Sequence, residues 1–176
     1  MLSPVRTLLI SVLAALGLAL AQDAVPEHRL AGEPAPWVAE VKALVKDPTR
    51  IPPNQTAELP EEGLLVYEYV NVELPGRTFE TVLLAVKKDD PEDYVLELTP
   101  GNKGKPIAPE ELGDVLLLGQ GPNFWVLSIR EGPFKGSYLV WSTATGHRGT
   151  GGEAIRIYSQ KALNREPVLA RLTSKR

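Results

Sequence analysis

The sequence predicts a mainly β protein: an antiparallel meander of about eight strands with one short N-terminal helix. The strands are expected to form a closed or nearly closed barrel, or a two-sheet sandwich. Two observations predict this class. From Gly63 onward, apolar residues recur with a period of two, which is typical of strands with one buried face. The connections between most of these runs are short, which favours antiparallel neighbours.

The expected strands lie at 64–74, 78–88, 94–99, 114–119, 123–130, 137–144, 153–159 and 167–173. Pro75 and Gly76 join the first two as the centre of a type II turn. "PEELG" (109–113) is expected to form one helical turn. Glu68 interrupts the apolar face of the first strand. A β-bulge or an exposed face explains it better than a buried unpaired carboxylate, which would cost free energy.

A single segment before Gly63, residues 36–47, has the 3.6-residue period of a helix. Pro36 suits the first helical position, and one apolar stripe is formed by Trp37, Val38, Val41, Leu44 and Val45. Residues 22–35 and 48–62 contain proline and lack periodicity. They predict a flexible leader and a connection without elements, and residues 36–176 are expected to form a single β-rich domain.

The N-terminal residues 1–21 predict a cleavable signal peptide. Arg6 is followed by the apolar run 8–20, and Ala19 and Ala21 flank Leu20 in an A-x-A cleavage site. The apolar run is shorter than the roughly 20 residues of a transmembrane helix, so no membrane span is expected after cleavage. The sequence therefore predicts a secreted or periplasmic protein.

Composition restricts the classes of partner and chemistry. The chain has a formal net charge of −3, which argues against a nucleic-acid partner. It has no cysteine and two histidines, which argues against thiolate catalysis and against a cysteine- or histidine-rich metal site. No cofactor motif is present, and neither a metal nor a cofactor is expected.

The loop "TATGHRGTGG" (143–152) is one candidate ligand-binding element. Its glycines could direct amide groups toward an anion, with His147 and Arg148 supplying hydrogen bonds and charge. However, the loop leads into a strand and not into a helix, so it lacks the context of a phosphate-binding loop. A hairpin loop that uses glycine for positive φ is the simpler interpretation.

Aromatic residues form the second candidate site. Six of the eleven aromatic residues lie within 124–158, and Trp125, Trp141 and Tyr158 are candidates to stack on a sugar ring or to line an apolar pocket. Burial in the core is the competing interpretation. The acidic stretch Asp89, Asp90, Glu92 and Asp93 does not have the spacing of a calcium loop, and it predicts a solvated hairpin tip.

Three functions fit these features. The leading hypothesis is an exported, non-enzymatic β-domain that binds an envelope protein or a polysaccharide. The alternatives are a barrel-type carrier of a small apolar molecule or lipid, and a small hydrolase with a carboxylate pair. The sequence contains neither a G-x-S-x-G nor an H-E-x-x-H motif, which argues against an enzyme.

We expect the exported protein to begin at Gln22, because signal peptidase cleaves after the second small residue of an A-x-A site. N-terminal sequencing of secreted material measures this directly. Exported protein that still begins at Met1 would show that the apolar run acts as an uncleaved anchor.

Overall fold

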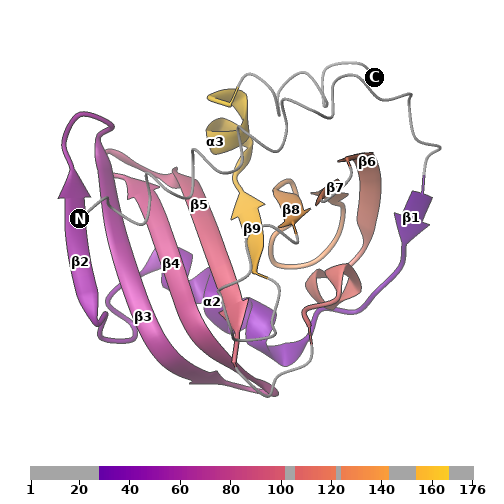
Figure 1. The fold of residues 1–176 in the computed structure, drawn as a ribbon, viewed down its shortest axis with the longest axis horizontal. Coiled ribbons are helices and arrows are strands. Elements are labelled where there is room, and N and C mark those ends of the chain that lie inside the picture. The colour runs from indigo at the N-terminus through magenta and orange to yellow at the C-terminus, as the bar shows by residue number, and fades with distance from the viewer. Residues whose placement is uncertain (1–27, 102–105, 122–123, 143–153, 167–176) are drawn as a thin grey trace.

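The computed structural model describes residues 28–101, 106–121, 124–142 and 154–166, and over these residues the protein is mainly β. Nine strands form one sheet in which every neighbouring pair is antiparallel, so the expected fold class is confirmed. The sheet is not closed. The strand order is β1-β6-β7-β8-β9-β5-β4-β3-β2, and β1 and β2 are its two edges (Figure 1).

The strands are β1 (His28–Leu30), β2 (Gln55–Leu59), β3 (Leu64–Leu74), β4 (Arg77–Lys87), β5 (Asp90–Pro100), β6 (Val115–Gly121), β7 (Phe124–Ile129), β8 (Tyr138–Ser142) and β9 (Ile155–Tyr158). The helices are α2 (Pro36–Lys46), the 3-10 helix η2 (Pro109–Leu112) and α3 (Gln160–Asn164). Strands β3 to β9 correspond to seven of the expected strands, and η2 is the expected turn in "PEELG". The eighth expected strand, 167–173, lies outside the described residues.

Two four-stranded meanders make up most of the sheet, where the sequence predicted one. Strands β2 to β5 are neighbours in the sheet in their order along the chain, and so are β6 to β9. Between them, the longer connection through η2 carries the chain away from β5, so that β6 does not become its neighbour. The last strands of the two meanders, β5 and β9, pair instead, with Val95 opposite Tyr158 and Glu97 opposite Arg156.

Helix α2 covers one face of the sheet, and its bounds agree with the helix expected over 36–47. All five residues of the expected stripe are buried. They join one apolar cluster with side chains from β3 to β9, and the ring of Trp37 meets that of Phe79 edge-on, with centroids 5.1 Å apart. In Figure 1 the helix lies behind β4 and β5, and the strands curve around it. Because α2 covers this face, the sheet does not have to close into a barrel to bury it.

Glu68 lies on the sheet face opposite α2. Leu64 and Val66 share that face in a small separate apolar cluster, whereas Tyr69 and Val72 belong to the cluster around α2. Asn71 has a φ of +52°, and this left-handed conformation interrupts the alternation between Tyr69 and Val72. Glu68 is half-buried, and its burial is therefore intermediate between the exposed face and the buried carboxylate considered from the sequence.

Three short elements lie where the sequence predicted none. Strand β1 falls within the expected leader, and β2 within the expected connection 48–62, which is a correction to that part of the analysis. Both are edge strands, and the four residues of β2 before Leu59 are exposed, so no period-two pattern is visible. Helix α3 has five residues, too few for a helical stripe, and it begins where the Ser159 side chain accepts a hydrogen bond from the amide of Ala162.

A buried ion pair crosses the junction of the two meanders. The guanidinium of Arg156 on β9 donates a 2.8 Å hydrogen bond to the carboxylate of Glu97 on β5. These side chains are 5% and 12% exposed. Removing one partner of such a pair costs more than the pair itself contributes, because a charge is left buried.

We expect Glu97→Ala to lower the free energy of unfolding by about 3–5 kcal/mol, because the Arg156 charge then stays buried without this carboxylate. Glu58→Ala is the matched control. It breaks the Lys88–Glu58 pair, whose side chains are 48% and 47% exposed, and it should cost less than about 1 kcal/mol. Denaturant unfolding measures both, and equal losses would contradict a structural role for the buried pair.

Candidate functional site

Two of the expected site residues, Trp125 and Trp141, lie together. They are cross-strand partners on β7 and β8, and their ring centroids are 4.8 Å apart at 35° between planes. Both are half-buried and pack against the apolar cluster around α2. This arrangement extends the core toward one end of the sheet. His147 and Arg148 lie outside the described residues.

Tyr158 does not join the tryptophan pair. Ile155 and Ile157 of β9 belong to the cluster around α2, so alternation places Arg156 and Tyr158 on the opposite face. Tyr158 is fully buried, and this burial raises the pKa of its hydroxyl against the opposing effect of the Arg156 charge. A phenol with a raised pKa stays neutral at physiological pH, and at this depth Tyr158 contributes to packing.

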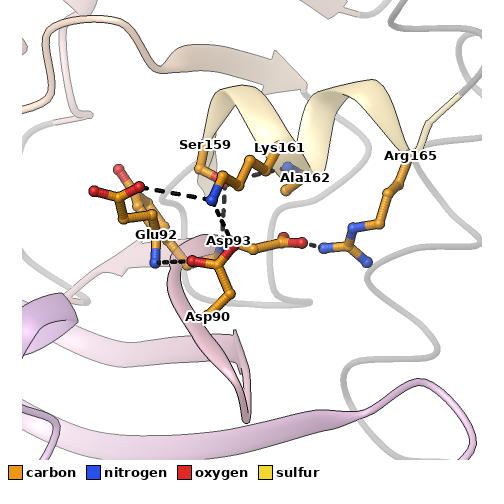
Figure 2. Close-up of polar contacts among 8 residues, drawn as sticks. Asp90, Glu92, Asp93, Ser159, Lys161, Ala162 and Arg165 are labelled. Carbon is orange, nitrogen blue, oxygen red and sulfur yellow. Dashed lines mark hydrogen bonds and ion pairs between the residues drawn. The ribbon is translucent and has the colours of Figure 1, made fainter.

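The acidic stretch lies at the β4–β5 hairpin tip, and Asp89 and Glu92 are exposed there, but Asp90, Glu92 and Asp93 also contact cations at the C-terminal helix. Lys161 on α3 binds Asp90 at 2.5 Å and Glu92 at 3.6 Å, and Arg165 binds Asp93, which is only 7% exposed (Figure 2). These contacts hold α3 against the start of β5. The ammonium of Lys161 lies among the carboxylates, and no group of His, Asp or Glu within the described part of the chain could hold a metal ion.

Positively charged side chains line two open grooves that share the residues Lys135, Gly136 and Gln160. We call them the Arg130 groove, of about 740 Å³, and the Lys42 groove, of about 450 Å³, and together the cationic cleft. Its charged lining consists of the cations Arg29, Arg130, Lys135, Lys42, Lys46 and Lys161, and the carboxylates Glu92 and Glu131. The cleft is therefore basic, although the chain as a whole carries an excess of acidic residues.

Half of these cations already bind carboxylates. Arg29 binds Asp114 at 2.7 Å, Lys135 binds Glu131 at 3.2 Å, and Lys161 binds the start of β5. Among the described residues, by contrast, no carboxylate pairs with Lys42, Lys46 or Arg130. Lys42 and Lys46 line one groove and Arg130 lines the other, and cations without a carboxylate partner in a groove create an attractive potential for an anionic ligand.

Lys42 is the most constrained of these three cations. Its ammonium donates to the hydroxyl of Tyr94 at 3.2 Å, and it lies 4.9 Å and 5.2 Å from the ring centroids of Tyr94 and Phe134. The Tyr94 hydroxyl is also 2.9 Å from the hydroxyl of Ser137. Both Tyr94 and Ser137 are buried, so these three polar groups form a connected array at the wall of the Lys42 groove.

Backbone contacts fix this array. The amide of Tyr94 donates to the Ser159 hydroxyl at 3.0 Å, and the amide of Ser159 donates back to the Tyr94 carbonyl at 3.0 Å. Gly136 has a φ of +87°, which allows the chain to turn sharply before Ser137. The amide of Gly136 donates to the Ile129 carbonyl, and the amide of Ile129 donates to the Ser137 carbonyl. The hydroxyl of Ser137 is thereby held against Tyr94.

None of the residues Lys42, Tyr94, Ser137 and Arg130 was predicted from the sequence as part of a binding site. One signal was available: Lys42 and Lys46 are four residues apart on α2, so they are neighbours on one helical face. Like charges at this spacing destabilise a helix slightly, although Lys46 in the last turn also interacts favourably with the helix dipole. Nothing in the local pattern shows that Tyr94 and Ser137 meet this face.

No family model matches this chain, and neither a curated protein nor a solved structure is found to resemble it. In the part of the chain that the structure describes, no helix combines the length and the apolar character needed to cross a membrane. The function is therefore argued from the cleft itself.

The contact between Asp90 and Lys161 generates a pH-dependent prediction. The hydrogen bond from Lys161 lowers the pKa of Asp90 from its ordinary value of 3.8, so this contact stabilises the fold above that value. Its contribution is lost as the pH falls through the lower value of the folded state. In Lys161→Met the Asp90 pKa should rise toward 3.8, as measured by a carboxyl NMR titration.

Asp47 provides the internal control for that titration. The hydroxyl and amide of Thr49 lower its pKa, and neither group changes in Lys161→Met. An Asp90 pKa that stays low in this variant while Asp47 is unchanged would show that Lys161 does not hold the hairpin.

Proposed function

We propose that this protein is an exported, non-enzymatic binding domain that holds an acidic polysaccharide of the cell envelope in the cationic cleft. The observation that supports this most directly is that three cations of the cleft, Lys42, Lys46 and Arg130, have no carboxylate partner among the described residues, although the chain as a whole is acidic. The signal peptide expected at residues 1–21 would bring the protein to the compartment that contains such polymers.

The shape of the cleft favours an extended ligand over a small enclosed one. Both grooves are open to solvent, and they share the lining residues Lys135, Gly136 and Gln160. A chain molecule could place one acidic group near Arg130 and another near Lys42. Several weak ionic contacts along one chain add up to useful affinity, although each exposed contact contributes little.

The packing of the core supports a binding domain over the alternative of an apolar carrier. The concave face of the sheet holds α2, and fully buried side chains fill the space between them, among them Trp37, Phe79, Leu84 and Leu96. A carrier would need an apolar cavity at this place. The two carboxylates of the cleft, Glu92 and Glu131, each bind a lysine, which gives little support to a hydrolytic carboxylate pair.

We expect the double variant Arg130→Ala, Lys46→Ala to bind polygalacturonate about fivefold more weakly than the natural protein. This figure corresponds to the loss of two exposed ionic contacts of about 0.5 kcal/mol each. Affinity should also fall as salt is added, because ions screen exposed charges. Isothermal titration calorimetry at two salt concentrations measures both effects.

Lys88→Ala is the matched control, since Lys88 is an exposed, salt-bridged lysine that lines neither groove. It should bind polygalacturonate like the natural protein, and neutral dextran should not bind at all. Equal losses in Lys88→Ala and in the double variant, or equal affinity for dextran, would overturn the proposed function.

A further inference from the structure

We infer that Lys42, Tyr94 and Ser137 form a preformed subsite for a single oxyanion, a carboxylate or phosphate group, at one end of the cationic cleft. This inference rests on the proposed function in that it assigns one acidic group of the polymer to a specific place. It differs from general charge attraction, because it requires particular hydrogen-bond donors held in fixed positions.

A count of donors and acceptors carries the inference. The ammonium of Lys42 has three N–H donors, and among the described residues it uses one of them on Tyr94. The hydroxyls of Tyr94 and Ser137 have two protons between them, and their mutual hydrogen bond uses one. Whichever hydroxyl donates, the proton of the other is left over. The array therefore has an excess of donors beside a positive charge, and an oxyanion supplies the acceptors that it lacks.

The surroundings of the array keep these donors in place. Tyr94 is 3% exposed and Ser137 is 5% exposed, so neither side chain can rotate freely into water. The rings of Tyr94 and Phe134 lie under the ammonium of Lys42, and contact with aromatic faces restrains a cation while its outer side remains open. A ligand that binds here would find its donors already ordered, which lowers the entropic cost of binding.

The position of the array within the groove leaves room for the ligand. Lys42, Tyr94 and Ser137 line the Lys42 groove together with Lys46 and the hydroxyl of Ser159. Ser159 accepts hydrogen bonds from the amides of Tyr94 and Ala162, so its own proton remains available as a further donor. Lys46 follows Lys42 by one helical turn and adds a second positive charge.

The test uses small anions, which cannot span the cleft, on the purified full chain. Inorganic phosphate, galacturonate and acetate are titrated separately and followed by amide and side-chain NMR shifts, which distinguish phosphate from carboxylate as the preferred group. We expect shifts centred on Tyr94, Ser137 and Ser159. Lys42→Met should raise the Kd of the preferred anion about tenfold or more, as expected for the loss of a charged hydrogen bond.

The hydroxyl pair gives a distinctive result. Tyr94→Phe and Ser137→Ala each leave one hydroxyl with its own proton, so each should raise the Kd only about threefold. The variant that combines Tyr94→Phe with Ser137→Ala has no hydroxyl donor, and its Kd should rise by more than the product of the two single effects. A packing role alone would not produce this pattern, and the spectra of the unliganded variants show whether the fold is kept.

The two proposals fail in different ways. The subsite is overturned if small anions cause no NMR shifts at Tyr94 and Ser137, even where polygalacturonate still binds. It is also overturned if the Kd of the Tyr94→Phe, Ser137→Ala variant rises only by the product of the two single effects. If the subsite shows the expected pattern but polygalacturonate binds no more tightly than galacturonate, the polymer-binding function fails and the subsite stands. Lys88 lies outside the Lys42 groove, so the control variant Lys88→Met should bind each small anion with the same Kd as the natural protein.

Discussion

The pairing of β5 with β9 is the interaction on which the rest of the molecule depends, because it is the place where the two meanders become one sheet. The buried pair between Glu97 and Arg156 lies across this junction. The proposed subsite lies across it as well: Tyr94 belongs to β5, whereas Ser137 and Ser159 belong to the other meander and its continuation. The hydrogen bonds between Tyr94 and Ser159 tie the two sides together. Any change that loosens the junction should therefore separate the donors of the subsite before it unfolds either meander.

Much of the local structure could be predicted because strands and helices leave periodic patterns. The bounds of β3 were predicted at 64–74, and the stripe of α2 was predicted residue by residue. The elements that were missed are those that leave no pattern. β2 is an exposed edge strand, and α3 has only five residues. The order of the strands in the sheet could not be predicted from the sequence either. It depends on where the long connection after β5 places β6, and periodicity carries no information about that placement.

The candidate site was missed for a related reason. Trp125 and Trp141 were both named as candidates from the sequence, and the structure pairs them directly across neighbouring strands. The array of Lys42, Tyr94 and Ser137 combines a helix, a strand and a turn. Lys42 and Tyr94 are 52 residues apart in the chain, and Tyr94 and Ser137 are 43 residues apart. No periodic rule relates such positions. Within each element these residues look ordinary: a polar helical position, an aromatic strand residue and a serine after a glycine turn.

The net charge of the chain does not describe the charge within the grooves, because several of its acidic residues are paired with cations inside the fold. Asp90 and Asp93 hold α3, Glu97 holds the sheet junction, and Asp114 holds Arg29 near β1. Each of these carboxylates is neutralised locally and contributes little to the field at a distance. The electrostatic potential at the cleft then depends mainly on the cations without a carboxylate partner in the described part of the chain, which are Lys42, Lys46 and Arg130. A protein with an excess of acidic residues can therefore present a locally basic groove where some of its carboxylates are paired within the fold.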